Sequence, residues 1–330
     1  DYTLNSESVS IPSVIDGKTV TSIRYMAFYN NKSIKSVTIP DTVIEISNRA
    51  FYNCTNLNEV NLGKKVDTIR DSAFGYTSFT SIVLPDSLTV LGDSVFAGNH
   101  NLTTLNIPKN LKTIVGLIFD NPSLKNINVD NENKYYTFLD GVLFNKDKTE
   151  LVAYLPTNEE NSYTIPSTVK ELGDGAFSHN EHLVTIVIPD SVETIGHRVF
   201  YNCTTLANIN IPSSVTAIGS SVFVNCNSLI DVTIDGNFGV LMFSFFENCE
   251  NLESVTFTGE IYRTYFGAFK NCPKLKTIIF DGLYELREDT IKDCPSLEKI
   301  QLSDVTQVIE KGFADDVSSS HLVVDIPDGM

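Results

Sequence analysis

Residues 195–212 read IGHRVFYNCTTLANINIP, and the stretch that follows repeats the same arrangement of apolar positions. Phe200 and Cys203 have their counterparts in Phe223 and Cys226. An anchor phenylalanine marks each copy: Phe28, Phe51, Phe74, Phe96, Phe119, Phe177, Phe200, Phe223, Phe246, Phe269 and Phe313, with Ile291 in the slot between the last two. Successive anchors lie 22 or 23 residues apart except across one insertion. Such a fixed period predicts a stacked repeat array.

Each copy has two halves with different periodicities. In the first half, Leu183, Ile186 and Ile188 alternate with polar residues before Pro189, which is typical of a short strand with one buried face. In the second half the apolar spacing is three to five, which indicates a return by turns or a short helix that carries the phenylalanine inward. The return contains a turn glycine in several copies, which we expect to adopt positive φ. These glycines are Gly92, Gly173, Gly196 and Gly219.

A single copy cannot bury its own apolar face, so the copies must stack and form interior columns. We therefore predict an α/β fold: a right-handed leucine-rich-repeat solenoid with parallel strands on a concave face and short turns or helices on the return side. One array is expected over residues 1–330. It is interrupted by a β-hairpin insertion at about 130–165, with apolar runs at 136–144 and 150–155 around a polar turn at 145–148. Another tight turn is expected at 15–18.

The repeat text Ile-Pro-x-x-Val-x-x-Ile-Gly-x-x-x-Phe-x-x-Cys-x-x-Leu resembles the BspA-like leucine-rich-repeat family of bacterial surface proteins. The segment Asp140–Lys148 is similar to a hairpin that recurs in that family. The resemblance covers nearly the whole chain. It implies a secreted or cell-surface protein of a host-associated bacterium, used for adhesion or protein–protein contact, with no catalytic motif to transfer.

Composition narrows the classes of partner. The formal net charge is −17 and no basic run occurs, so nucleic acid and anionic membrane surfaces are poor partners. No apolar run reaches the length of about 20 residues that spans a bilayer, so no membrane insertion is predicted. The sequence starts at Asp1, and we expect a leader to have been removed from an extracellular or cell-surface protein.

All six cysteines occupy one repeat position: Cys54, Cys203, Cys226, Cys249, Cys272 and Cys294. They lack the close pairs of a metal finger. Stacked rungs could bring neighbouring thiols within disulfide range. Asn31, Asn99 and Asn180 hold the same slot elsewhere. The interpretation we favour is therefore a buried, reduced column at a position that requires a small side chain.

The sequence contains few residues in patterns typical of a metal site or a catalytic site. His179 and His182 could pair on a metal, but no third ligand accompanies them, and the oxygen-rich segment 130–133 lacks the spacing of a calcium loop. No nucleophile elbow or phosphate loop occurs. We predict no enzyme activity, no cofactor and no metal.

The outward side of the repeat strands, here called the strand face, carries rows of short polar residues. They predict either a docking surface or merely a soluble exposed sheet. The candidate ligand-binding residues on this face are Thr104, Asn106, Asn126, Asn128, Thr185, Asn208, Asn210, Asp231 and Thr233.

A second candidate is an aromatic patch on the return segments, which either marks a partner site or repacks copies that lack the turn glycine. Its residues are Phe238, Phe243, Tyr262, Tyr265 and Tyr284.

The function that these observations favour is an extracellular binding or adhesion module that recognises a host or microbial macromolecule through protein–protein contact, such as a host extracellular-matrix or surface protein. One alternative is a carbohydrate-binding or enzyme-accessory module whose aromatic residues stack on sugar rings. The other is a structural spacer on the cell surface. Full burial of Tyr262 or Tyr265 would count against sugar stacking.

Overall fold

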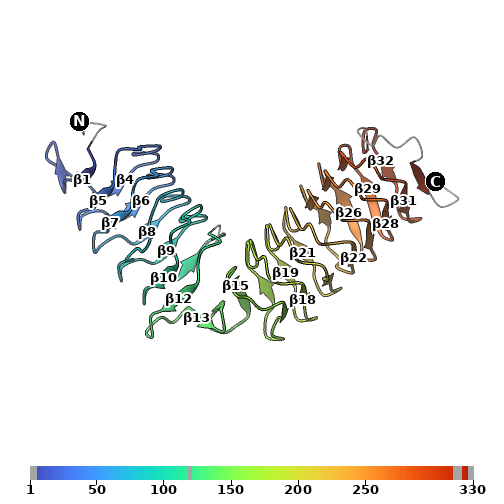
Figure 1. Ribbon diagram of the computed structural model, residues 1–330, viewed down its shortest axis with the longest axis horizontal. Coiled ribbons are helices and arrows are strands. Elements are labelled where there is room, and N and C mark those ends of the chain that lie inside the picture. The colour runs from blue at the N-terminus through green and yellow to red at the C-terminus, as the bar shows by residue number, and fades with distance from the viewer. Residues whose placement is uncertain (1–5, 118–120, 315–321, 326–330) are drawn as a thin grey trace. The chain divides into compact units, whose positions relative to one another are not determined.

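The computed structural model describes residues 6–117, 121–314 and 322–325, so the predicted anchor Phe119 lies outside the described residues. The chain forms two compact units, which divide within the predicted insertion. The first unit is Asp1–Asp147 with Ala153–Thr157, and the second is Lys148–Val152 with Asn158–Met330. Within each unit, short strands stack rung upon rung (Figure 1).

The first unit contains parallel strands on two sides of its stack of rungs. The strand-face side is formed by β1 (Ser8–Ser10), β5 (Ser36–Thr38) and β7 (Glu59–Asn61), and by the pair β10 (Thr104–Ile107) and β12 (Asn126–Val129). The return side is one five-stranded sheet of β4 (Ser22–Ile23), β6 (Glu45–Ile46), β8 (Thr68–Ile69), β9 (Val90–Leu91) and β11 (Thr113–Ile114).

The second unit repeats this plan over more rungs. Its strand face consists of the pair β16 (Ser162–Thr164) and β18 (Thr185–Val187), and of a six-stranded sheet of β20 (Asn210–Ile211), β22 (Asp231–Ile234), β25 (Ser254–Phe257), β28 (Thr277–Phe280), β31 (Lys299–Leu302) and β33 (Val323–Asp325). Its first return strands are β15 (Glu150–Tyr154), β17 (Glu171–Leu172), β19 (Thr194–Ile195) and β21 (Ala217–Ile218).

Three later rungs of the second unit have two return strands each, and the rung after them has one in the described residues. One sheet contains β23 (Val240–Leu241), β26 (Ile261–Thr264), β29 (Leu283–Leu286) and β32 (Val308–Ile309). The other contains β24 (Phe246–Glu247), β27 (Phe269–Lys270) and β30 (Ile291–Lys292).

The anchor phenylalanines form the core of both units, as predicted. Phe51 and Phe74 stack with ring centroids 5.2 Å apart in the first unit. In the second unit Phe223 stacks on Phe200 at 5.3 Å and on Phe246 at 5.1 Å. All five side chains are fully buried. Repetition of one large ring at one position therefore supplies both the burial and the ring stacking that hold neighbouring rungs together.

No helix occurs in the described residues, so the short helices predicted on the return side are wrong. The reason is the backbone pairing of the return segment. The amides of Arg49, Phe51 and Asn53 donate to the next rung, whereas those between them close local turns to residues three positions earlier. Arg49 and Asn53 have φ of 55° and 60°, which a helix cannot include. Every second amide thus donates to a carbonyl of the neighbouring rung and cannot form a helical hydrogen bond.

The turn glycines have a different role from the one expected. Gly92, Gly173, Gly196 and Gly219 are not among the residues with positive φ. A Cβ on Gly196 would lie 2.8 Å from the backbone nitrogen of Asp174, and one on Gly219 would lie 2.5 Å from that of His197. Glycine at these two positions therefore permits close approach of the rung before it.

Two antiparallel hairpins interrupt the parallel pattern of the first unit. The predicted turn at 15–18 is confirmed, because β2 (Val14–Ile15) pairs with β3 (Lys18–Thr19) around Asp16 and Gly17. In the insertion, β13 (Tyr136–Leu139) pairs with β14 (Val142–Asn145). Asp140 and Gly141 have φ of 51° and 80°, as a two-residue turn requires. The run at 136–144 is therefore a hairpin in itself and not one strand.

Candidate functional site

On the strand face, buried and exposed side chains alternate along the strands, as the sequence predicts. Leu105, Ile127, Ile186, Ile209 and Val232 are buried. Seven of the nine candidate residues are exposed and the other two, Thr104 and Thr185, are half-buried. The strands pair in register, so each outward side chain lies beside its equivalent in the next rung. A ligand on this face would therefore meet rows of like polar groups.

In the first unit, Asn106 and Asn128 lie beside each other and line a hollow of about 300 Å³. Asn128 Nδ2 donates to Asn106 Oδ1 at 2.8 Å, and Asn126 Nδ2 donates to Asn128 Oδ1 at the same distance. Asp86 and Asp130 complete the polar part of the wall. The linked amides keep N–H and C=O groups at the rim, where they suit the backbone or side chains of a peptide.

The remaining candidate residues belong to the second unit. Asn208 Nδ2 donates to Thr185 Oγ1 at 3.5 Å, and Asn210 pairs in register with Thr233. Asp231 Oδ1 accepts a hydrogen bond from Ser254. The predicted set thus forms one group in each unit, and the group in the first unit lines a hollow.

One member of the predicted aromatic patch does not lie at the surface. Phe238 is 1% exposed and packs on Phe245 inside the core, so its assignment to the patch is wrong. The four others form two pairs. Phe243 is 45% exposed and lies 4.9 Å from Tyr265, while Tyr262 is 46% exposed and stacks on Tyr284 at 5.1 Å. Tyr262 is therefore accessible, and Tyr265 is half-buried.

Sequence reasoning missed a column of tyrosines on the return side of the first unit. Tyr29 and Tyr52 stack at 5.6 Å, and Tyr76 meets Tyr52 edge-on at 5.3 Å. The guanidinium of Arg49 lies 5.7 Å from the Tyr52 ring centroid. Tyr25 is exposed in the same copy as Tyr29. The signal was present in the sequence, because a tyrosine follows the anchor phenylalanine directly in two of these three copies.

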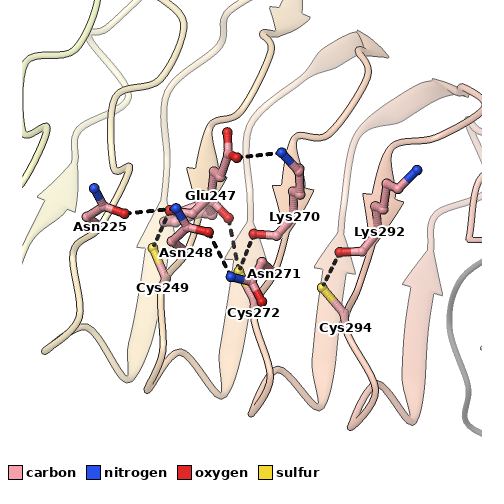
Figure 2. A network of polar contacts seen from close by, with 10 residues as sticks. Asn225, Glu247, Asn248, Cys249, Lys270, Asn271, Cys272, Lys292 and Cys294 are labelled. Carbon is pink, nitrogen blue, oxygen red and sulfur yellow. Dashed lines mark hydrogen bonds and ion pairs between the residues drawn. The ribbon is translucent and has the colours of Figure 1, made fainter.

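The cysteine column is buried and reduced, as predicted. Each thiol lies within hydrogen-bonding distance of the carbonyl of the anchor phenylalanine one copy earlier, as Cys203 does with Phe177 at 3.1 Å and Cys272 with Phe246 at 2.9 Å. Figure 2 shows the last three thiols, which also face the backbone carbonyls of the rung that carries them. Asn99 donates to Phe74 O at 2.8 Å in the same way. The slot therefore holds a small hydrogen-bond donor in the cysteine copies and at Asn99, whereas the buried Nδ2 of Asn180 has no partner among the described residues.

Burial makes three of these thiols poor nucleophiles. It raises the pKa of Cys54 to about 11 and that of Cys203 to about 12. The pKa of Cys226 is also raised by burial. A thiol reacts as the thiolate, so these groups stay protonated and unreactive near neutral pH.

An asparagine ladder runs beside the cysteines in the second unit. Asn271 Nδ2 donates to Asn248 Oδ1 at 2.8 Å, and Asn248 donates to Asn225 at 3.0 Å (Figure 2). Asn225 in turn donates to Asn202. Asn202 Nδ2 ends 3.2 Å from His179 Nδ1. His179 is thus part of a structural ladder.

The described residues contain no group of three or more His, Cys, Asp or Glu side chains that could hold a metal ion. The segment 130–133 has a structural use, because Asn133 is buried and its side-chain amide bonds four backbone groups. No helix in the described part of the chain has the length and apolar character needed to cross a membrane.

The model of the BspA type leucine-rich repeat region matches the chain in six copies, over residues 21–145, 153–276 and 241–324. The chain belongs to this family. BspA-type proteins are repeat proteins suited to protein interaction and are generally not enzymes. No curated protein matches the sequence significantly.

Solved structures support the same fold, a parallel-strand solenoid of leucine-rich-repeat type. A leucine-rich repeat protein from Eubacterium ventriosum is 27% identical, with a TM-score of 0.85 over 98% of this chain and 85% of that one. The pneumococcal vaccine antigen PcpA is 19% identical, with a TM-score of 0.60 over 100% and 91%. A leucine-rich cell surface protein from Faecalibacterium prausnitzii is 23% identical, with a TM-score of 0.57 over 94% and 91%.

Proposed function

We propose that this BspA-type chain is a binding module on the outside of a bacterial cell, and that its strand face holds a protein ligand in an adhesion role. The observation that carries the proposal is the pair Asn106 and Asn128, whose linked amides line a hollow on an exposed parallel sheet. The F. prausnitzii protein is described as a cell surface protein, which supports the location.

The chemistry of the hollow favours a peptide over a small apolar ligand. Asn106 and Asn128 are exposed and offer both donors and acceptors, and Asp86 and Asp130 are also exposed. An extended segment of a partner protein needs such alternating donors and acceptors for its own amides and carbonyls. Apolar contact is confined to Leu84 and the residues at the strand end.

The test compares two double variants of the purified chain on a panel of immobilised extracellular-matrix proteins. Asn106→Ala with Asn128→Ala removes both amides from the hollow, and Asn56→Ala with Asn58→Ala removes two exposed amides elsewhere in the first unit. We expect the first pair to weaken binding about tenfold, the size of effect that loss of roughly 1.4 kcal/mol gives. The second pair is expected to bind normally.

Melting temperatures of both variants should stay close to that of the unmodified chain, since all four side chains are exposed. Equal binding by the two double variants would show that the hollow is not the protein-binding site. Binding by neither the unmodified chain nor the variants to any matrix protein would reject the adhesion role itself.

A further inference from the structure

A groove of about 590 Å³ lies in the second unit, where the strand-face strands turn into the return strands. Its polar and aromatic lining comes from successive rungs: Asn237 after β22, Glu260 and Tyr262 after β25, and Asp281 and Tyr284 after β28. In these rungs the strand is followed by Asp235-Gly236, Thr258-Gly259 and Asp281-Gly282, whereas most earlier copies have a proline directly after the strand.

One rung lacks a side chain where it lines the groove. Val240 pairs in register with Arg263, so Gly239 is the neighbour of Tyr262 in the preceding rung. A Cβ built on Gly239 meets no atom within 4 Å. The ring of Tyr262 stacks on Tyr284 of the following rung, with the two planes 13° apart. The Cβ position of Gly239 therefore faces open space, in the rung next to the one that carries Tyr262.

The charge of the groove is negative and uncompensated. Glu260 and Asp281 are exposed, and their carboxylates take part in none of the hydrogen bonds or ion pairs of the described residues. No lysine or arginine lines the groove. A third carboxylate, that of Asp235, lies directly after β22, in the turn that contains Asn237. The hydroxyl of Thr258 donates to it at 2.6 Å.

The Tyr262 ring already contacts a cation from its own chain. The guanidinium carbon of Arg263 lies 4.9 Å from the ring centroid, and Arg263 Nε lies 3.7 Å from Glu285 of the following rung. Arg263 does not line the groove and leaves Glu260 and Asp281 without a partner. A guanidinium plane stacks well on a tyrosine ring, and its fork of N–H groups matches a carboxylate.

We propose that this groove binds an arginine side chain presented by a short extended segment of a partner protein. The guanidinium would lie beside Tyr262 in the space that Gly239 leaves, and Glu260 and Asp281 would accept its hydrogen bonds. The lining residues from Asn237 to Val305 come from four rungs. Three steps of about 4.8 Å make about 14 Å, which about four extended residues span. This site is separate from the Asn106–Asn128 hollow.

A sugar ring is the other ligand that stacks on tyrosine. A neutral sugar would leave the charges of Glu260 and Asp281 uncompensated as it excludes water from them, whereas an arginine neutralises them. The unpaired carboxylates therefore favour the cation, and sugar binding becomes an outcome of the experiment.

The experiment titrates the full chain with a fluorescently labelled peptide of sequence Gly-Gly-Arg-Gly-Arg-Gly-Gly at physiological ionic strength, with fluorescence anisotropy as the readout. One variant, Gly239→Leu, fills the open space. A second, Glu260→Gln with Asp281→Asn, removes the two charges without changing shape. The matched control, Asp190→Asn with Glu250→Gln, removes two exposed charges of the same unit that do not line the groove.

We expect saturable binding that weakens about tenfold or more in both groove variants and changes less than about twofold in the control. A peptide with lysine in place of arginine is expected to bind more weakly. An equal loss in the control would show that net charge alone attracts the peptide and would overturn the proposal. Absence of saturable binding would also overturn it.

Binding of the chain to an array of neutral oligosaccharides tests the sugar alternative. Sugar binding that Gly239→Leu abolishes, without arginine-peptide binding, would assign the groove to a glycan and reject the arginine site. The variant with Asn106→Ala and Asn128→Ala is expected to bind the peptide like the unmodified chain. Failure of the strand-face proposal and failure of this one are therefore observed separately.

Discussion

At the position three residues after the anchor phenylalanine, Asn99 makes the same hydrogen bond as the cysteines, because both kinds of side chain donate to the carbonyl of the anchor one copy earlier. Asn99 donates to Phe74 O and Phe96 O, and its Oδ1 lies 2.5 Å from the hydroxyl of Thr77. The sequence predicted that this slot is small and buried. It did not predict the donor, because the carbonyl belongs to a residue about 25 positions earlier, and only stacking brings the two together.

Asn99→Ala is expected to lower the free energy of unfolding by about 2–3 kcal/mol, since it removes the donor and leaves a small cavity among buried polar groups. Asn99→Cys keeps a donor of a kind that the slot accepts elsewhere, and should lose less than half as much. Denaturant unfolding measures both values. Equal losses in the two variants would mean that volume and not the hydrogen bond decides the slot.

The buried thiol of Cys203 makes the stability of the protein sensitive to alkali. The unfolded thiol ionises near pH 9, whereas burial raises the pKa of Cys203 to about 12 in the folded chain. The folded state therefore keeps its proton above pH 9, and the stability that Cys203 contributes is intact below pH 9 and falls as the pH rises towards 12.

On the order of 1 kcal/mol should be lost from this thiol at pH 10. Unfolding curves of the unmodified chain and Cys203→Ala at pH 8 and pH 10 measure it, because the variant should lose less stability between the two pH values. Identical losses would show that Cys203 ionises normally in the fold.

At the scale of single elements, the strands were predictable and the return segments were not. The alternation around Ile186 and Val232 identifies the buried and exposed faces of a strand without any tertiary information. Return segments such as 47–54 combine inter-rung hydrogen bonds with positive φ at Arg49 and Asn53. Apolar spacing of three to five is compatible with a helix as well as with this backbone, so the sequence could not separate the two.

Gly196→Ala tests the close approach between return segments. The added Cβ would lie 2.5 Å from Asp174 Oδ1 and 2.8 Å from its backbone nitrogen, so we expect a loss of about 1–3 kcal/mol. Gly239→Ala is the matched control, because its Cβ meets no atom within 4 Å and its φ is not positive. Thermal melting should show the first variant destabilised and the second unchanged or slightly stabilised. Similar melting temperatures would refute the contact explanation.

At the scale of the whole molecule, the period of 22 or 23 residues predicted the stacking and the phenylalanine column. The prediction of one continuous array over 1–330 stays a prediction, as do the handedness and the concave curvature. The groove beside Tyr262 was not predictable, since it depends on which residue precedes each return strand in three neighbouring rungs. The sequence named Tyr262 and Tyr284 as aromatic candidates but could not place Gly239 next to them.

A stacked array transmits a defect mainly to its neighbours. Phe51→Ala removes a fully buried ring from the first unit and should cost about 3–5 kcal/mol. Native-state hydrogen exchange is expected to accelerate in the rungs next to Phe51 and to remain unchanged in the second unit. A uniform acceleration along both units would show that the chain unfolds as one cooperative body.

The hydrogen bonds that repeat from one return segment to the next also affect how the gene can gain or lose copies. The amide of Phe200 donates to Val222 of the next rung just as that of Phe177 donates to Val199, so consecutive rungs make the same demands on one another. Recombination between two copies of such a coding repeat, in register, would add or delete a whole rung while every junction keeps its donors, acceptors and stacked rings. Copy number can therefore drift between descendants, and a groove built from the turns of successive rungs can be gained or lost in a single recombination event.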